Sequence, residues 1–509
     1  MKKKQFYIVA CVFLLVFAIA AGTALAAAAA KPPAAGPGTL TVAMFGEPPS
    51  ICPVSHNSQI GEMFNMALYN SLFLINDNLE AVPDLCESYE NPSATEWIFK
   101  LRRGVKFHNG AEMRAEDVVA SILRAKGSVR VGRFAVKFTT IEALDEYTVK
   151  IVTDGPYSDI LYDLSHTGNS ICPKALIDAN HDFNKEPMGT GPFKHGRWVL
   201  GDRLTMDRFD GHFNPERKAK VQSIIFKFIP EPSARTIALE AGEVDVVHQV
   251  EFMDIERLRA TPGIKVQSRE TISFIAMVLN NEKPGLDNVL VRKALNAAVD
   301  RVPVIKVAVN GHGTPTYSQI PSMPGGSEVG VVTHNIEQAK KYMAESGVNP
   351  ASLDITIICS EEHRRRSAEV IQAAWADLGV NAKIEMMEVA TYLTRGARGD
   401  FAASIAGYSN RSLLAWIKTV FSAASIGATS GSPRMNNPAV EAQIAVAEST
   451  LDPAKRIAEL EKLSKIINEL SPRVPLYQET MFKAYNANVE SVDMEPNGQV
   501  YYHKVGWIR

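Results

Sequence analysis

The sequence has few of the residues that signal catalysis, metal binding or nucleic-acid binding. Its 509 residues include five cysteines, and none forms a C-x-x-C pair, which disfavours a structural zinc or thioredoxin-type site. The formal net charge is −2, whereas nucleic-acid binding requires a basic face. The H-E-x-x-H, G-x-S-x-G and G-x-G-x-x-G motifs are absent. We therefore expect no enzyme, no catalytic residue, no cofactor and no nucleic-acid partner, and a hydrolase is only a distant alternative.

A long apolar run occurs only at the N-terminus. Three lysines at positions 2–4 precede an uncharged stretch from about Phe6 to Ala30, which contains the small-residue sequence Ala24-Leu25-Ala26. This order is typical of a secretory signal, so residues 1–26 are predicted to be a signal peptide and the mature protein to be periplasmic and soluble. An uncleaved membrane anchor is the alternative, because the run is long enough to span a bilayer.

The predicted mature chain is mildly acidic and retains few cysteines. Removing three lysines leaves 51 basic and 56 acidic residues, a net charge of about −5. The remaining cysteines are Cys52, Cys86, Cys172 and Cys359. An oxidising compartment permits disulfides, and four cysteines allow three pairings, among which the sequence does not choose.

The hydrophobic pattern predicts an α/β protein with two kinds of region. The N-terminal half is rich in strands, with a first strand over 39–44 and a predicted hairpin of 97–101 with 105–107. From about Thr271 strands and helices alternate, which indicates a parallel sheet with crossover helices. The predicted strands there are 353–359, 382–388 and 401–406, and the helices 361–378 and 391–397. Helices over 438–450 and 453–470 then lead to strands near 474 and 500.

Two charged or glycine-rich stretches resemble anion sites only superficially. Gly189-Thr190-Gly191 with Lys194 lacks the spacing of a phosphate loop, and Pro192 removes a backbone donor, so we interpret it as a structural turn. The run Arg364-Arg365-Arg366 begins a predicted helix, and we interpret it as a solvated face.

Four segments resemble the family 5 extracellular solute-binding proteins, the group that includes dipeptide-, oligopeptide- and nickel-binding proteins. The most specific covers 83–119 and includes Trp97-Ile98-Phe99-Lys100-Leu101-Arg102-Arg103-Gly104-Val105. The others are 188–194, 238–245 and 286–301, and together they follow the family's order along almost the whole mature chain. The resemblance implies the periplasmic binding subunit of an ABC importer. Such a subunit is expected to be a monomer that takes a small-molecule or peptide ligand and docks on a membrane permease.

The resemblance also implies two lobes joined by a two-segment hinge. The core of the larger lobe is expected from 27–50, 170–270 and 476–509, with 51–169 as its subdomain, and the second lobe from 271–475. A ligand would be enclosed between the lobes as the hinge closes.

Topology predicts which residues reach the ligand. In α/β sheets ligands lie beyond the carboxyl ends of strands. The strand over 39–44 delivers Phe45 and the loop with Asn57 and Ser58, and the strand over 401–406 delivers the segment from Gly407 to Ser412, including Asn410. In the loop that carries His166 and Ser170, the resemblance implies further contacts.

The segment 407–411 suggests the kind of ligand. Peptide-binding relatives have Gly-Trp-x-x-Asp there, and the aspartate pairs with the peptide's amino group. This chain resembles that motif but has Tyr408 for the tryptophan and Arg411 for the aspartate. Because guanidinium pairs with carboxylate or phosphate, the hypothesis is a peptide-like or acidic solute with an anionic group on Arg411. The alternatives are that Arg411 points to solvent, or that the match to the motif is shifted by one or two residues.

A metal-chelate or haem ligand is the second hypothesis, because some relatives carry nickel. His56 and His166 would then be the candidate ligands, although loop histidines without metal are the simpler interpretation, and no metal site is predicted.

Overall fold

The fold was analysed in a computed structural model that describes residues 38–428 and 431–508. The predicted signal peptide, residues 1–26, lies outside the described residues. Within the described part of the chain, none of the helices combines the length and apolar character needed to cross a membrane.

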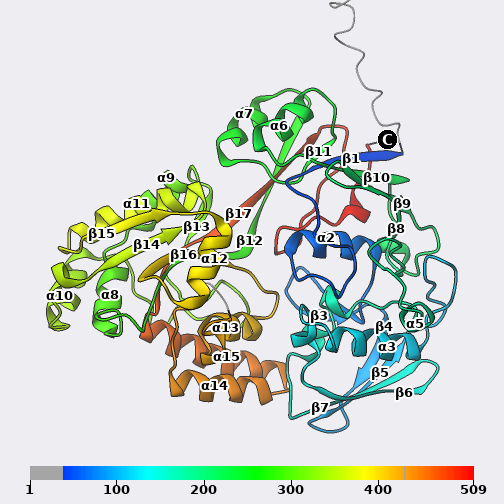
Figure 1. The fold of residues 1–509 in the computed structure, drawn as a ribbon, viewed down its shortest axis with the longest axis horizontal. Helices are drawn as coiled ribbons and strands as arrows, with labels where there is room; N and C mark the ends of the chain where they lie inside the picture. Colours follow the sequence, from blue (N-terminus) through cyan, green and yellow to red (C-terminus); the bar gives the residue numbers. More distant parts are fainter. Residues whose placement is uncertain (1–37, 429–430, 509) are drawn as a thin grey trace, which may run out of the picture.

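Two long antiparallel strands, β12 (Ile264–Leu279) and β17 (Arg473–Asn486), run through the middle of the molecule and join its two lobes (Figure 1). They belong to a sheet with the order β15-β14-β16-β12-β17-β11-β1-β10-β9-β8, and β13 (Gly313–Pro315) also pairs with β17. The pairing of β12 with β17 shifts register between Glu270 and Phe274, where the strands pass from one lobe to the other. The confirmed fold class is thus a two-lobed α/β protein.

The larger lobe, to the right in Figure 1, is formed from the N-terminal half and the C-terminal tail. In it β1 pairs in parallel with β10 and β11, and β11 pairs with β17, so the tail completes the sheet. Its elements are β1 (Thr39–Met44), α2 (Gln59–Leu68), β8 (Phe193–Val199), β9 (Arg203–Arg208), β10 (Ser223–Phe228), α6 (Pro232–Glu240), β11 (Val246–Val247) and α7 (Ile255–Ala260).

A subdomain of this lobe has its own four-stranded sheet, β4-β5-β7-β6, covered by α3 (Ala115–Lys126). The predicted hairpin of 97–101 with 105–107 is wrong, because β5 pairs with β4 on one side and β7 on the other and has no free edge. The remaining elements are β2 (Phe73–Ile75), β3 (Ala81–Pro83), β4 (Cys86–Glu90), β5 (Glu96–Leu101), β6 (Phe138–Asp145), β7 (Thr148–Thr153), α4 (Ile160–Asp163) and α5 (Lys174–Asp178).

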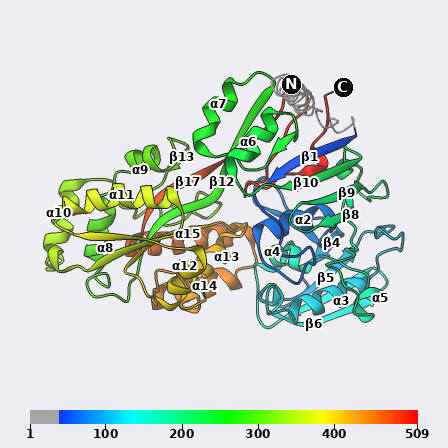
Figure 2. The same ribbon diagram turned by 45° about the horizontal axis from the view of Figure 1, so that its top comes forward.

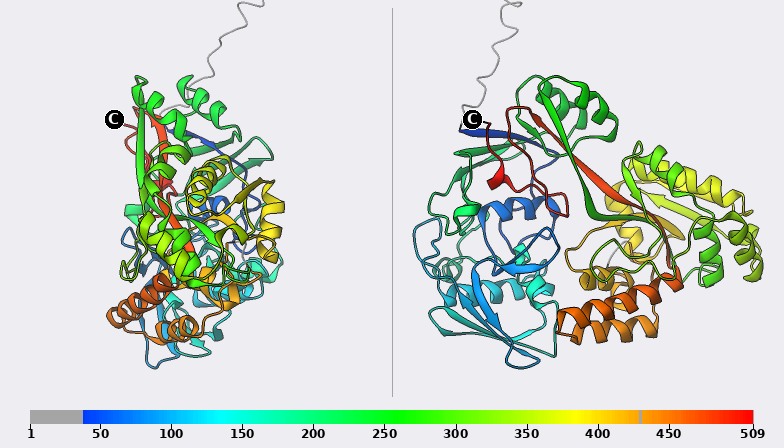
Figure 3. Two further views of the ribbon diagram at one scale, coloured as in Figure 1. Left: turned by 90° about the vertical axis from the view of Figure 1, so that its left-hand side faces the viewer. Right: turned by 180° about the vertical axis from the view of Figure 1, so that it is seen from behind.

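The smaller lobe contains the predicted parallel strands, with β14 between β15 and β16. Helices pack on this sheet around Trp375, whose indole N–H donates to the carbonyl of Leu295 at 2.9 Å. Figures 2 and 3 show this lobe from other directions. Its elements are α8 (Val289–Ala297), α9 (Arg301–Ala308), α10 (Ile336–Glu345), β14 (Ile355–Cys359), α11 (Glu362–Ala376), β15 (Ala382–Met386), α12 (Val389–Arg398), β16 (Ala403–Tyr408), α13 (Leu413–Phe421), α14 (Pro438–Ser449) and α15 (Pro453–Leu470).

The position of β16 brings its carboxyl end to the hinge. This strand is parallel to β14 and antiparallel to β12, with Tyr408 opposite Phe274 and Ala403 opposite Leu279. Since Phe274 adjoins the register shift between the lobes, the chain leaving β16 enters the space between them.

The four cysteines of the described chain are buried free thiols. Cys52 Sγ accepts a hydrogen bond from Arg124 Nη2 at 3.1 Å. Burial raises the pKa of the Cys86 and Cys172 thiols to about 12, which keeps them protonated and unreactive.

Candidate ligand site between the lobes

A cavity of about 240 Å³ lies between the lobes and is lined by both. The larger lobe contributes residues of α2, of the loops near Arg133 and His166, and of the C-terminal tail, and the smaller lobe contributes 409–412 and Ala415. A site built from two lobes that share a hinge is complete only when the lobes approach.

The start of α2 places a carboxylate in this cavity. Ser58 caps the helix, and its hydroxyl accepts a hydrogen bond from the backbone N–H of Gly61 at 3.3 Å. Glu62 lies in the first turn, where the partial positive charge of the helix N-terminus favours an anion.

Glu62 is hydrogen-bonded to His166. The Nε2 atom of His166 lies 3.3 Å from a carboxylate oxygen of Glu62, and its Nδ1 accepts from the backbone N–H of Gly168 at 2.9 Å, so the Nε2–H donates to the carboxylate. The imidazole stacks on Phe134 with a centroid distance of 3.6 Å. Burial alone raises the pKa of Glu62, but the His166 hydrogen bond and the charge of Arg411 outweigh it, and the pKa is lowered.

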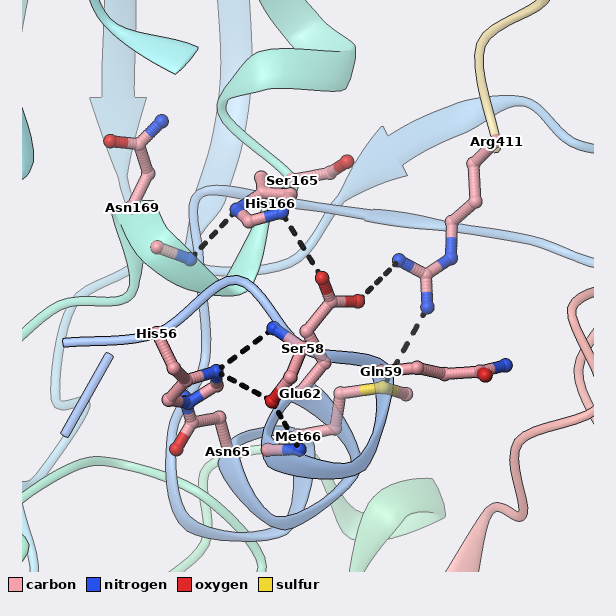
Figure 4. A network of polar contacts seen from close by, with 12 residues as sticks. His56, Ser58, Gln59, Glu62, Asn65, Met66, Ser165, His166, Asn169 and Arg411 are labelled. Carbon is pink, nitrogen blue, oxygen red and sulfur yellow. Dashed lines mark hydrogen bonds and ion pairs between the residues drawn. The ribbon is translucent and has the colours of Figure 1, made fainter. Parts of the chain in front are cut away.

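Arg411 links the two lobes inside the cavity (Figure 4). It follows β16 of the smaller lobe, and its Nη2 lies 2.9 Å from a carboxylate oxygen of Glu495 in the C-terminal tail. Its Nη1 lies 3.8 Å from the second oxygen of Glu62. Burial lowers the pKa of Arg411, but the two carboxylates outweigh it, so the pKa is raised and the guanidinium stays charged.

A second polar link between the lobes lies beside this cavity. The buried Asp159 accepts a hydrogen bond from Ser412 Oγ at 2.8 Å and forms an ion pair with Arg456 of α15. The neighbouring Ser158 donates its backbone N–H to the carbonyl of Glu448 at 2.8 Å. These contacts join the subdomain of the larger lobe to α14 and α15.

Two further cavities share lining residues with this one. Arg411 also lines a cavity of about 340 Å³, and Gln59 also lines one of about 510 Å³ beside β17, which we call the hinge cavity. Arg364 lines the hinge cavity with its Nε 3.1 Å from Glu361, so the interpretation of this arginine as part of a solvated helix face is wrong.

Residues 80–416 match the model of the bacterial extracellular solute-binding proteins, family 5. The chain belongs to this family. Its function is therefore that of the solute-binding subunit of an ABC importer, as the sequence predicted.

Individual members show how far the similarity extends. The chain is 27% identical to the dipeptide-binding protein of Escherichia coli K12, over 87% of this chain and 89% of that protein. It is 24% identical to a glutathione-binding protein of Salmonella choleraesuis, over 94% and 96%. The structure of AgaA from A. tumefaciens R10 in complex with agropinic acid superposes with a TM-score of 0.78 at 24% identity, over 92% and 99% of the two chains.

The structure brings four of the eight residues predicted to bind solute into the 240 Å³ cavity, namely Asn57, His166, Asn410 and Arg411. Ser58 caps α2 beside this cavity, Phe45 lines the hinge cavity, and Ser170 lines the cavity of about 340 Å³. Tyr408 packs against the smaller lobe's core, and its hydroxyl accepts from the backbone N–H of Gly431 at 3.0 Å. Contact of these residues with a ligand stays a prediction.

Sequence reasoning missed the two carboxylates that hold Arg411. Glu62 could have been found, since it lies in the first turn of a helix that follows a strand and its loop. Glu495 could not, because it lies in an irregular tail 84 residues beyond Arg411. Arg133 was also missed: it lines the cavity beside Phe134 and forms no ion pair with any described residue.

The two histidines named as candidate metal ligands are already occupied. His56 Nδ1 accepts from the backbone N–H of Ser58 at 3.3 Å, and its Nε2 lies 2.9 Å from Asn65 Nδ2. Both ring nitrogens of His166 are also engaged, one by Glu62 and the other by the backbone N–H of Gly168. Across residues 38–428 and 431–508, no three His, Cys, Asp or Glu side chains are grouped to hold a metal ion.

Proposed function

We propose that this protein captures a small peptide-like or acidic solute in the periplasm by closing its lobes, and passes it as a monomer to a membrane permease. It performs no chemistry on the solute. The observation that carries the proposal is the position of Arg411 between the lobes, where it faces Glu62 in the 240 Å³ cavity and Glu495 in the neighbouring one.

Closure follows from where these charges are held. When the lobes separate, Arg411 loses both carboxylates and regains water, so its ion pairs stabilise only the approached state. A solute that adds contacts to both lobes shifts the equilibrium toward that state by its differential affinity. A permease that recognises the closed form would thereby receive mainly loaded protein.

The cavity's charges suit a solute that carries an acid together with an amino group. The guanidinium of Arg133, which forms no ion pair with any described residue, and the Nη1 edge of Arg411 offer positive charge to a carboxylate. The Glu62 oxygen that faces Arg411 at 3.8 Å has room to accept from an ammonium group. Dipeptides and glutathione, named for two relatives, and agropinic acid, bound to a third, fit this class.

The test is a thermal-shift screen of residues 27–509, followed by titration calorimetry. The probes are L-Met-L-Leu, glutathione, agropinic acid, the Ni²⁺–histidine complex and haem. A ligand that binds only the folded protein raises Tm, by an amount that follows from its concentration over Kd. Stabilisation by an acidic or peptide-like probe, lost in Arg133→Gln and Arg411→Gln, supports the proposal. Stabilisation by Ni²⁺–histidine or haem alone would establish the metal-chelate or haem alternative instead.

A further inference from the structure

The hinge cavity contains a buried lysine that pairs with none of the described residues. Lys483 lies on β17, and 1% of its surface is exposed. It lines the cavity, yet its ammonium group forms neither a hydrogen bond nor an ion pair with any residue the structure describes. Burial without a compensating charge lowers the pKa of Lys483 to about 7.

Three acids line this cavity, namely Glu251, Glu361 and Glu479. None of them forms an ion pair with Lys483 in the described part of the chain, and two are engaged elsewhere. Glu361 lies 3.3 Å from His363 and 3.1 Å from Arg364, and Glu479 accepts from the hydroxyl of Ser273. The buried His248 shares a 2.8 Å hydrogen bond with the hydroxyl of Tyr502. Its pKa is well below the ordinary value because it is buried, so it stays neutral. None of these groups neutralises Lys483.

We propose that the hinge cavity is a carboxylate-binding compartment, in which Lys483 takes an acid group of the solute. This inference rests on the proposed function, because it makes the compartment an extension of the solute site past Gln59, which lines both cavities. An entering carboxylate replaces the hydration that burial removed from the ammonium.

The charge balance favours a carboxylate over a phosphate. The ammonium group of Lys483 carries one positive charge that no described residue pairs with, and it therefore matches a single negative charge. The carboxylates of Glu251, Glu361 and Glu479 line the same cavity, and they would repel a dianion more strongly than a monoanion.

Lys483→Met tests the assignment, because it removes the charge and keeps the length of the side chain. The variant is expected to fold and to have a higher Tm without ligand, since a buried unpaired charge is removed. Lys465→Met on α15 is the matched control with the same chemical change. The probes are sodium acetate and sodium succinate against acetamide and succinamide, at ionic strength equalised with sodium chloride.

We expect acetate and succinate, but not the amides, to raise the Tm of the parent protein and of Lys465→Met. None of the four probes is expected to change the Tm of Lys483→Met. Equal responses of parent and Lys483→Met, or no response of the parent to carboxylate, would overturn the inference. For a solute identified by the screen, Lys483→Met is expected to weaken binding by roughly tenfold or more, the usual loss of a charged hydrogen bond.

The same experiment separates the two proposals. A solute that binds parent and Lys483→Met equally leaves the proposed function standing and rejects the role of Lys483. Acetate binding through Lys483, with no probe of the solute screen binding, supports a site for free carboxylate ions and rejects the proposed solute class.

Discussion

Replacing Arg411 with glutamine is expected to disable closure far more than replacing its partner Glu495. In the closed arrangement Arg411→Gln leaves two carboxylates, Glu62 and Glu495, without their shared cation. Glu495→Gln instead leaves one cation facing one carboxylate. The double variant leaves Glu62 alone, still hydrogen-bonded to His166. We therefore expect Arg411→Gln to be most harmful, and the double variant to recover part of the loss.

The magnitude follows from burial. The side chains of Arg411 and Glu495 are 19% and 5% exposed. Removing one partner of a buried pair typically costs 3–5 kcal/mol, and the residual exposure of Arg411 places the cost at the lower end, about 3 kcal/mol. The open state carries little of this cost, because water solvates the separated groups. At about 1.4 kcal/mol for each factor of ten, solute affinity is expected to fall roughly 100-fold.

Titration calorimetry with the solute found by the screen measures the affinity, and small-angle X-ray scattering measures whether saturating solute still compacts the molecule. Exposed Arg398→Gln on α12 is the control for the loss of one arginine. If Arg411→Gln binds within about threefold of the parent, or if Glu495→Gln is the more damaging change, the ion pair does not stabilise the closed state and the reasoning fails.

Two further predictions concern stability. Gly191→Ala is expected to destabilise the fold by about 1–3 kcal/mol or more, because an added Cβ would lie 2.4 Å from the carbonyl oxygen of Ala67. Chemical denaturation measures this loss, and an unchanged midpoint would contradict a structural role for the turn. Burial lowers the pKa of His212 to about 4 and that of His503 to about 2, so both stay neutral in the folded protein while the unfolded chain takes up protons below about pH 6.5. The two neutral histidines therefore contribute to the free energy of unfolding above pH 6.5, and each loses roughly 1 kcal/mol of that contribution by pH 5.5. The Tm should fall less steeply with decreasing pH in His503→Gln than in the exposed control His334→Gln.

Local patterns determined much of the fold. The helix predicted over 438–450 matches α14 to within one residue, and the helix predicted over 453–470 has the observed bounds of α15. The second begins with Asp452 as its cap and Pro453 in its first turn, which are signals carried by neighbouring residues. The alternation after Thr271 likewise predicted the parallel strands, because the period of apolar residues distinguishes strand from helix without tertiary information. The predicted 97–101 hairpin failed since the partners of a strand are decided by distant segments.

The candidate site was also predictable from the sequence only in part. The rule that ligands lie beyond the carboxyl ends of strands placed Asn410 and Arg411 in the cleft from the sequence alone. Only the tertiary structure showed that Arg411 is held by Glu62 and Glu495, and that Lys483 has no partner among residues 38–428 and 431–508. Whether a buried charge is compensated depends on which side chains from distant parts of the chain approach it, and on how much water is excluded there. Neither quantity is encoded in the spacing of residues along the sequence.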